Sequence, residues 1–434
     1  MKIFWQKNSG GIIILVLSLL PALEWLRLAP LNTRFYNLSA TMTSLGQVAG
    51  LVGLALFSVN LVLTGRLKIF DRLFFGLNNA YNYHRQIGAI GFSLLLFHPL
   101  LLAVAYLQIS TLAAARFLLP FYDAAITYGI ISLLMMILFL GLTFYGSLKY
   151  HHWKITHKLM LVAFIFGLLH VLSITSDVSR DPFLKTYLIA LGLLGLGVGA
   201  YRAVLSYFWH RNFSYKIQRL NRLSAGITEI ELAPIGRALD FLSGQFVFVR
   251  FFSRHIQSES HPFSISSAPS PSQISLAIKS LGDFTDRVKD LEPGDTVSLE
   301  GPFGKFSYRN GRHKKQIWIA GGIGITPFLS MARSLTDDRY QIDLYYCVRQ
   351  PGEAVFLPEL ENIAQKNSAL HLIPWYSQTS GYLTGQAVEE KSAGLRDKDI
   401  FICGPDNLMS ALKAQLRDQG VAASDIYSEE FKFL

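Results

Sequence analysis

The sequence predicts a multi-domain fold: a six-helix transmembrane bundle, then an antiparallel β-barrel, then an α/β domain. Three observations predict it. The 434 residues are 51% hydrophobic and only 16% charged, which is too apolar for an ordinary soluble enzyme. The long uncharged runs are confined to residues up to about 209. From Phe213 on, short alternating stretches give way to alternating strands and helices around a Gly-rich turn.

Six apolar runs follow one another in the first half, and each has roughly the 20 residues that a membrane-crossing helix needs. We expect spans at about residues 11–29, 41–64, 84–106, 123–147, 154–175 and 183–209. The first run lacks a small-x-small cleavage site, so we interpret it as a helix rather than as a signal peptide.

The charges of the loops predict the orientation. The loops after the second and fourth spans are rich in Lys and Arg, whereas the opposite loops are poorer in basic residues or balanced by acids. By the positive-inside rule, both termini are then cytoplasmic, and the third and fifth spans both run outward. Many of the residues behind the net charge of +10 lie in such short loops, so we expect no nucleic-acid partner.

Histidines are paired along the third and fifth spans. His84 and His98 are 98 − 84 = 14 residues apart, and His157 and His170 are 170 − 157 = 13 apart. At about 1.5 Å per residue each pair covers roughly 20 Å of helix. A lone helical histidine often only satisfies a neighbouring polar group. Two pairs at matching depths instead predict two stacked haems, each held by one histidine from either span.

The two spacings differ in helical phase. Fourteen residues is close to four turns, so His84 and His98 share a face, whereas thirteen residues separates His157 from His170 around an ideal helix. We therefore expect the fifth span to bend or the haems to be laterally offset. Gly88, Gly91 and Gly167 lie between the paired histidines and either make room for porphyrin or allow close helix packing.

The second half of the chain reads as two further domains. Short alternating runs after Phe213 are typical of a small antiparallel barrel. The apolar strand starting at Gln316 runs into a Gly-rich turn at 321–327 and then a helix, an arrangement that lets backbone amides approach a pyrophosphate. Such turns are common, so this signal is weak by itself. The expected domains are 1–210, 211–311 and 312–434.

The two cysteines, Cys347 and Cys403, are far apart in the chain. Their spacing supports neither a disulfide framework nor a Cys-ligated iron–sulfur cluster. We interpret both as core residues.

The order of four motifs carries a resemblance. They are His261-Pro-Phe-Ser-Ile-Ser-Ser-Ala-Pro, Gly301-Pro-Phe-Gly, Ala320-Gly-Gly-Ile-Gly-Ile-Thr-Pro and Cys403-Gly-Pro. The second half resembles ferredoxin–NADP reductase-type flavoproteins. Joined to six spans with paired histidines, the chain resembles the NADPH oxidase/ferric reductase superfamily, and bacterial NADPH oxidase homologues look closest. The resemblance implies a multi-pass protein of the bacterial inner (plasma) membrane.

The resemblance implies a role for each matching residue. His261, Pro262, Phe263 and Ser264 match the FAD-binding strand, with the Ser264 hydroxyl near the reactive flavin nitrogen. The other residues implied to contact FAD are Ser266, Ser267, Gly282 and Thr285 toward its phosphates, and Gly301 and Gly304 near the flavin or nucleotide.

The nucleotide site is implied in the same way. The matching residues are Gly321, Gly322, Gly324 and Thr326 in the dinucleotide loop, and Cys403, Gly404 and Pro405 beside the nicotinamide. In the family an aromatic residue near the terminus covers the flavin; Phe431 is our choice and Phe433 the alternative. Arg349 follows a strand and is placed to pair with the 2′-phosphate of NADPH, although a solvated arginine would look the same and NADH stays open.

Taken together, these features predict transmembrane electron transfer. NAD(P)H would reduce FAD, and single electrons would pass through two b-type haems to an acceptor outside, either O2, giving superoxide, or a ferric complex. A protein partner as acceptor is possible but not required, and the membrane part contacts lipid. One departure concerns Leu102, where some eukaryotic oxidases carry another histidine beyond the outer haem ligand.

Overall fold

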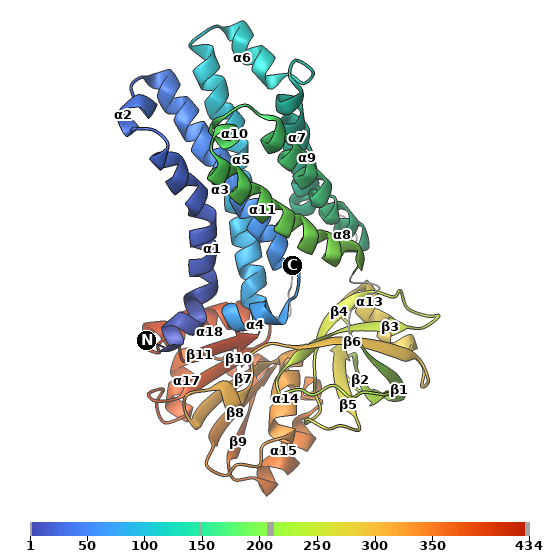
Figure 1. Ribbon diagram of the computed structural model, residues 1–434. Helices are drawn as coiled ribbons and strands as arrows, with labels where there is room; N and C mark the ends of the chain where they lie inside the picture. Colours follow the sequence, from blue (N-terminus) through green and yellow to red (C-terminus); the bar gives the residue numbers. More distant parts are fainter. Residues whose placement is uncertain (1, 147–149, 206–211, 430–434) are drawn as a thin grey trace. The chain divides into compact units, whose positions relative to one another are not determined.

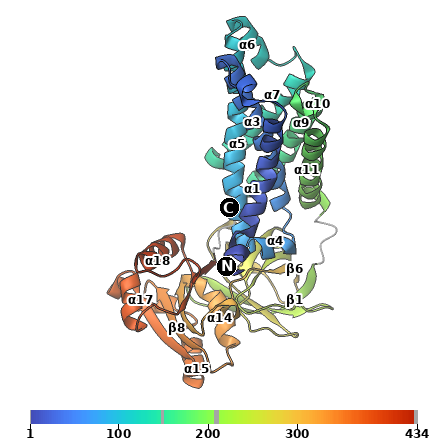
Figure 2. The same ribbon diagram turned by 60° about the vertical axis from the view of Figure 1, so that its left-hand side comes forward.

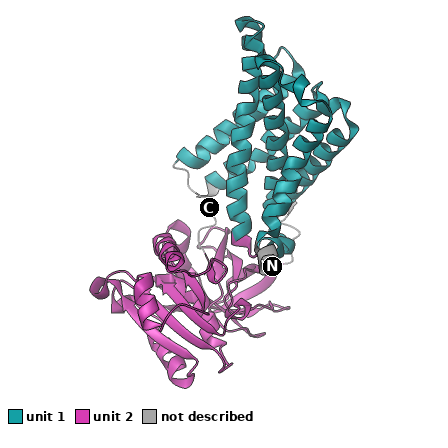
Figure 3. Cartoon of the chain, turned by 90° about the vertical axis from the view of Figure 1, so that its left-hand side faces the viewer, with its two compact units in different colours: residues 1–74, 79–209 teal, residues 75–78, 210–434 magenta. Residues whose placement is uncertain are grey.

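The computed structural model describes residues 2–146, 150–205 and 212–429, and the chain forms two compact units (Figures 1 and 3). The first comprises residues 1–74 and 79–209, and the second comprises residues 75–78 and 210–434. The domain limits expected at residues 210 and 311 stay predictions.

The first unit is helical. Its helices are α1 (Lys2–Arg27), α2 (Leu31–Arg34), α3 (Leu38–Leu63), α4 (Lys68–Leu73), α5 (Leu77–Leu107), α6 (Thr111–Leu118), α7 (Ala124–Tyr145), α8 (Tyr150–Lys158), α9 (Met160–Ser173), α10 (Asp177–Arg180), α11 (Pro182–Ala200) and the π-helix η1 (Tyr201–Leu205). Within the described ranges, six helical segments are long and apolar enough to cross a membrane: α1, α3, α5, α7, α8 with α9, and α11 with the start of η1. This confirms the predicted six-helix bundle.

Side chains at the helix starts explain where several spans begin. The Asn37 side chain accepts a hydrogen bond from the Ala40 backbone N–H at the start of α3 (2.8 Å), and Asp123 accepts one from Ile126 at the start of α7 (2.8 Å). Asp181 precedes the first residue of α11 and caps it, because its carboxylate accepts a hydrogen bond from the Leu184 N–H (2.6 Å). Each cap supplies a partner to a backbone donor that the first helical turn would leave unpaired.

The bundle packs around α3. Helices α1 and α11 lie against α3, and α7 lies against α9. The buried core joins them through Trp25, Phe57, Phe164 and Leu188, each less than 9% exposed. Phe57 and Phe164 meet edge to face with ring centroids 4.9 Å apart. Apolar packing across these helices therefore holds the two histidine-bearing segments at a defined distance.

The second unit begins with an antiparallel barrel. Its strands are β1 (Phe213–Arg222), β2 (Ile227–Pro234), β3 (Phe246–Phe252), β4 (Ser260–Ser264), β5 (Ile274–Lys279) and β6 (Thr296–Phe303), in the order β4-β3-β6-β1-β2-β5. A bridge between Ile265 and Leu276 joins the two edges. Alternate residues of these strands point inward and form one apolar core.

A five-stranded parallel sheet completes the unit. Its strands are β7 (Lys315–Gly321), β8 (Gln341–Val348), β9 (Leu370–Tyr376), β10 (Asp399–Cys403) and β11 (Ile426–Glu429), in the order β11-β10-β7-β8-β9. Helices α14 (Ile325–Arg333) and α15 (Leu357–Lys366) cover one face, and α17 (Gly385–Lys391) and α18 (Asp406–Asp418) cover the other (Figures 1 and 2). The strand order reverses between β7 and β10, which is where such sheets bind ligands.

Candidate functional site

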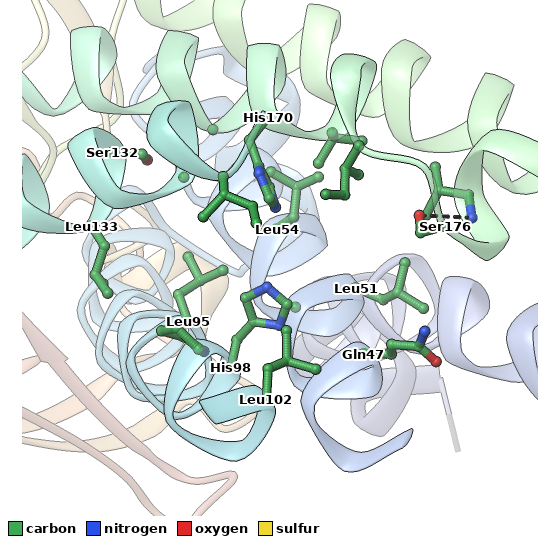
Figure 4. Close-up of a pocket in the computed structure, with 18 of the residues that line it drawn as sticks. Gln47, Leu51, Leu54, Leu95, His98, Leu102, Ser132, Leu133, His170 and Ser176 are labelled. Carbon is green, nitrogen blue, oxygen red and sulfur yellow. Dashed lines mark hydrogen bonds between the residues drawn. The ribbon is translucent and has the colours of Figure 1, made fainter. Parts of the chain in front are cut away.

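The four predicted histidines form two facing pairs. The ring centroids of His98 on α5 and His170 on α9 are 6.3 Å apart, and Figure 4 shows the two rings pointing toward one another. The rings of His84 on α5 and His157 on α8 are 6.2 Å apart. The same α5 helix thus contributes one member of each pair, at two levels of the bundle.

The separations fit a metal ion between the rings. A bond from a metal to an imidazole nitrogen is about 2 Å long, so two imidazoles on opposite sides of one ion have their ring centres about 6 Å apart. Both pairs have this separation. The histidines at each level therefore fit ligation of one haem iron from both faces.

Backbone carbonyls orient three of the four rings. His98 Nδ1 lies 2.7 Å from the Gly46 carbonyl oxygen, and His170 Nδ1 lies 2.7 Å from that of Ala125. His84 Nδ1 lies 3.1 Å from the carbonyl of Asn60. Because each Nδ1–H donates to a carbonyl, Nε2 is the free ligating atom. Metal-binding histidines are usually oriented in this way.

Two glycines make room for the outer pair. A Cβ on Gly50 would lie 2.8 Å from His98 Nδ1, and one on Gly129 would lie 3.0 Å from His170 Nδ1. By contrast, Gly88 and Gly91 face the Asn60 and Leu56 side chains of α3. Gly88 and Gly91 therefore serve helix packing, which was one of the two roles expected.

The fifth span is interrupted at Leu159, where α8 ends and α9 begins. The Leu159 N–H donates to the Thr156 carbonyl (3.1 Å), a 3₁₀-type bond that spans one residue fewer than an α-helical bond. This break lies between His157 and His170. It allows both to face α5 despite the thirteen-residue spacing, as the expected bend requires.

A cavity of about 540 Å³ surrounds the outer pair. Its wall comes mainly from apolar side chains, among them Leu51, Leu54, Leu95 and Leu102 (Figure 4). Polar groups such as Gln47 and Ser176 lie at one end. The site combines a size and an apolarity suited to a porphyrin with two opposed ligands.

The FAD residues implied by the resemblance gather at the ends of barrel strands. Ser264 ends β4, and Ser264 and Ser266 are buried with hydroxyls that have no partner among the described residues. His261 lies against the Phe284 ring (3.9 Å between centroids) and bonds to Glu259 (2.9 Å). Buried hydroxyls without partners are uncommon, so the pair of serines fits a bound polar group.

The remaining FAD residues have structural partners of their own. Ser267 accepts a hydrogen bond from the Ser275 N–H on its hydroxyl and from the Ser330 hydroxyl on its carbonyl. Thr285 accepts hydrogen bonds from the N–H groups of Leu281 and Gly282 and so shapes that turn. The Ser267 hydroxyl is therefore already engaged within the fold.

Two Gly-rich turns approach each other closely where the nucleotide site is predicted. A Cβ on Gly324 would lie 2.3 Å from the Cys403 carbonyl oxygen, and one on Gly404 would lie 2.9 Å from the Gly321 Cα. Gly322 has φ +55° and open space above it. The ends of β7 and β10 thus leave a backbone-lined cradle at the point of strand-order reversal. Thr326 is buried there and donates to the Ile323 carbonyl (3.1 Å).

The barrel and the α/β sheet meet beside this cradle. Gly301 precedes a cis Pro302, and the turn continues to Gly304 with φ +97°. A Cβ on Gly304 would lie 3.4 Å from Glu429 Oε2, and Glu429 pairs with Cys403 in the sheet. The predicted residues Gly301, Gly304, Cys403 and Gly404 are therefore brought toward one place.

The remaining predicted residues are Cys403, Arg349 and the two terminal aromatic residues. Cys403 is fully buried, and burial, with the nearby Glu429 carboxylate, raises the pKa of its thiol well above the usual range. The thiol is thus neutral and is not a nucleophile. Arg349 is exposed directly after β8, at the ligand edge of the sheet. Phe431 and Phe433 lie outside the described residues.

Several groups of this site were not anticipated from the sequence. They are the carbonyls of Gly46, Asn60 and Ala125, the glycines 50 and 129, and the side chains of Gln47 and Glu429. Backbone carbonyls carry no sequence signal, because every residue has one. The acidic pair before the terminal aromatic residues was the only available hint to Glu429.

Comparison with known proteins identifies three segments. Residues 49–168 match the ferric reductase like transmembrane component family, residues 213–307 match an FAD-binding domain family, and residues 318–414 match the oxidoreductase NAD-binding domain family. The glycine betaine monooxygenase reductase subunit of Pseudomonas aeruginosa is 30% identical over 210 residues, 44% of this chain and 56% of that protein. The chain thus spans little more than half the length of that relative.

Two haem-related flavoproteins are also similar. The flavohemoprotein of Bordetella pertussis is 25% identical over 319 residues, covering 66% of this chain and 77% of that protein. A crystal structure of flavohemoglobin from Malassezia yamatoensis superposes with a TM-score of 0.52 at 16% identity, over 90% of this chain and 98% of that one. At this identity the likeness shows the fold alone.

These matches agree with the architecture described above. The membrane segment, the FAD-binding barrel and the nucleotide-binding sheet follow one another in one chain. The protein is an integral membrane oxidoreductase with FAD- and NAD-binding domains, which support electron transfer driven by NAD(P)H. This combination of domains is the architecture of the NADPH oxidase/ferric reductase superfamily.

Proposed function

We propose that this protein carries electrons across the membrane, from NAD(P)H through FAD and two b-type haems to O2, which becomes superoxide. The observation that carries the proposal is the stacking of two histidine pairs with ring separations of 6.2 and 6.3 Å on one helix pair. Structural histidines seldom need such repeated geometry. The proposal is further supported by the presence of reductase domains in the same chain.

The chain's residues have distinct tasks in this proposal. His84 and His157 hold the inner haem, and His98 and His170 hold the outer one. When bound, FAD splits the two-electron donor into single-electron steps, and the haems conduct those electrons through an apolar layer some 30 Å thick. Ser264 and Ser266 offer hydroxyls to FAD, and Gly321 to Gly324 offer backbone to the nucleotide.

The outer cavity favours O2 over a ferric complex. Its described lining is mainly apolar, and its one acidic residue, Asp177, is paired with Arg34 (3.1 Å). With a porphyrin in this cavity, a small neutral molecule reaches its edge through such an apolar lining at little cost, whereas a charged chelate would lose its hydration. A ferric complex reduced at the protein surface is the second candidate, and an outer partner protein is the third.

The loop charges predict on which side of the membrane NAD(P)H donates its electrons. With both termini cytoplasmic, the reductase domains face the cytosol of a bacterial inner membrane. Arg349, exposed at the ligand edge of the sheet, is placed to pair with the 2′-phosphate of NADPH. NADH remains the alternative donor.

Stopped-flow reduction of the purified, FAD-loaded protein tests the proposal. NADPH is mixed with the protein while Soret absorbance and dismutase-sensitive superoxide are followed. Haem reduction with superoxide release is the expected result. If the haem stays reduced until a ferric chelate is added, the protein is a ferric reductase instead. Absence of a haem spectrum would remove the basis of the proposal.

A further inference from the structure

The outer cavity is polar at one end, and Gln47 is the side chain of interest there. Gln47 lies on α3 between Gly46, whose carbonyl orients His98, and Gly50, which makes room for the His98 ring. In Figure 4, Gln47 and Ser132 lie at opposite ends of the pocket with the outer histidines between them. Gln47 is therefore a polar group on the same turn of α3 that supports the outer ligand.

Two serine hydroxyls of the cavity lining already donate to backbone carbonyls. The Ser132 hydroxyl donates to the Ala163 carbonyl (2.8 Å), and the Ser39 hydroxyl donates to the Ala105 carbonyl (3.5 Å). The Asp177 carboxylate accepts from Arg34 (3.1 Å). The two serine hydroxyls are therefore engaged as donors, and the Asp177 carboxylate is engaged as an acceptor.

The orientation of the Gln47 amide is determined by Trp25. The indole N–H of Trp25 donates to Gln47 Oε1 at 3.1 Å. An indole nitrogen can only donate, so the amide oxygen must face Trp25 and the NH2 group must face the other way. No described residue accepts a hydrogen bond from that NH2 group, and Gln47 lines the outer cavity, so we infer that the NH2 group is open to this cavity.

Trp25 is itself held rigidly. It is 1% exposed, its backbone carbonyl accepts from Arg34 Nη2 (2.8 Å), and the Arg34 guanidinium lies 3.5 Å above the indole ring. Arg34 therefore holds Trp25 in place by stacking and a hydrogen bond, and the Trp25 indole in turn orients the Gln47 amide. Gln47 is presented to the cavity with its donor group pre-oriented.

We propose that Gln47 is the hydrogen-bond donor that the outer cavity offers to the acceptor, with Trp25 as its positioning residue. This inference rests on the proposed function and deepens it, because it assigns the acceptor as a small molecule that gains negative charge on reduction. Dioxygen fits this description. One electron moves to O2 and yields the superoxide anion; no bond is formed or broken and no proton is transferred.

The Gln47 NH2 group can speed the reduction of O2 because the acceptor becomes negatively charged. O2 is neutral and gains nothing from an N–H group, whereas superoxide in an apolar cavity has lost its water. A pre-oriented donor stabilises the product and the developing charge more than the reactant. Hydrogen bonds to charged groups are stronger than those to neutral groups, so removal of the donor should slow the transfer about tenfold.

The test uses the full-length protein with both cofactors bound. Haem is reduced anaerobically with dithionite, excess reductant is removed, and the protein is mixed with buffers of increasing O2 content while haem reoxidation is followed. The variants are Gln47→Glu, which keeps an acceptor for Trp25 but loses the NH2 group, and Gln47→Met. Gln108→Met, at an exposed glutamine outside the cavity, is the matched control.

Both Gln47 variants should reoxidise about tenfold more slowly with O2, whereas Gln108→Met should match the unmodified protein. Reoxidation by ferricyanide, which is too large and charged for the cavity, should not change. The haem spectrum and midpoint potentials should also stay the same. Trp25→Phe, which frees the amide to turn, should slow only the O2 reaction, by about threefold.

Other results would contradict either the role of Gln47 or the proposed function. Unchanged O2 reoxidation in both Gln47 variants overturns the inference. Equal slowing with ferricyanide, or a shifted potential, also overturns it, because Gln47 would then act on the haem. If the unmodified protein reoxidises with O2 but releases no superoxide, the proposed function fails whatever Gln47 does.

Discussion

The inner and outer histidine pairs have nearly the same ring geometry but different support. Ring centroids are 6.2 and 6.3 Å apart, and the interplanar angles are 72° and 67°. In the outer pair both Nδ1 atoms contact carbonyls at 2.7 Å. In the inner pair the one such contact is 3.1 Å, and His157 Nδ1 is buried with no partner among the described residues.

The difference shows that ligand placement and ligand anchoring are separate properties. Helix packing alone brings both pairs to the separation a metal needs. Hydrogen bonds to Nδ1 add orientation and make the imidazole a stronger ligand. His157 instead lies parallel to the Trp153 ring, 5.4 Å between centroids. We therefore expect the outer site to be rigid and the inner site to be the more easily opened.

Removal of one ligand from each pair should have the largest effect. His98→Leu should eliminate the outer haem, about half of the haem absorbance, and reduce superoxide production by at least about 100-fold, because electron transfer stops at the inner level. His84→Leu should instead prevent haem reduction by NADPH. Flavin reduction should persist in both. Haem per protein and stopped-flow traces give the answer, and full two-haem absorbance in His98→Leu would refute the ligand assignment.

A side chain in place of Gly129 should damage only the outer pair. A Cβ there would lie 3.0 Å from His170 Nδ1, so Gly129→Val should displace the ring and lose about half or more of the outer haem. Gly141→Val on the same helix is the control, because nothing lies within 4 Å of its Cβ. Electron paramagnetic resonance measures the outcome through the two low-spin signals that the proposed haems should give. Equal loss of both signals would contradict the separate support of the two pairs.

Loss of the Trp153 ring should open the inner pair. His157 has no hydrogen-bond partner at Nδ1 among the described residues, so its orientation depends on stacking against Trp153. Trp153→Leu should therefore let carbon monoxide displace His157 from ferrous haem in about half of the molecules or fewer. The outer haem should bind none. The CO difference spectrum measures this, with the His98→Leu variant assigning the signal. Binding at the outer haem instead would reverse the proposed order of rigidity.

The smallest effect should come from substitution of Asn60, whose backbone carbonyl accepts a hydrogen bond from His84. Its side-chain Oδ1 is buried without a partner in the part of the chain that the structure describes, so Asn60→Leu should raise the unfolding free energy by about 1 kcal/mol. Asn37→Leu on the same helix removes the α3 cap and should lower it by about 1 kcal/mol. Thermal unfolding in detergent compares them. Lower stability with loss of inner haem in Asn60→Leu would mean that the amide contacts the bound group.

The sequence by itself determined the features that depend on local pattern. Runs of about 20 apolar residues specify the membrane helices, and the spacing of His84 and His98 specifies two levels on one face. Motif order along the chain specified the flavin and nucleotide domains. These signals are local, because hydrophobic length, helical period and Gly-rich turns are set by neighbouring residues.

Tertiary structure alone decided how these parts are supported. The break at Leu159, the carbonyls behind three histidines and the contact of Trp25 with Gln47, 22 residues away, all depend on the register between helices. The burial of Cys403 depends in the same way on the packing of β10 between β7 and β11. Register between elements results from side-chain packing over the whole bundle or sheet, so no short stretch of sequence contains it.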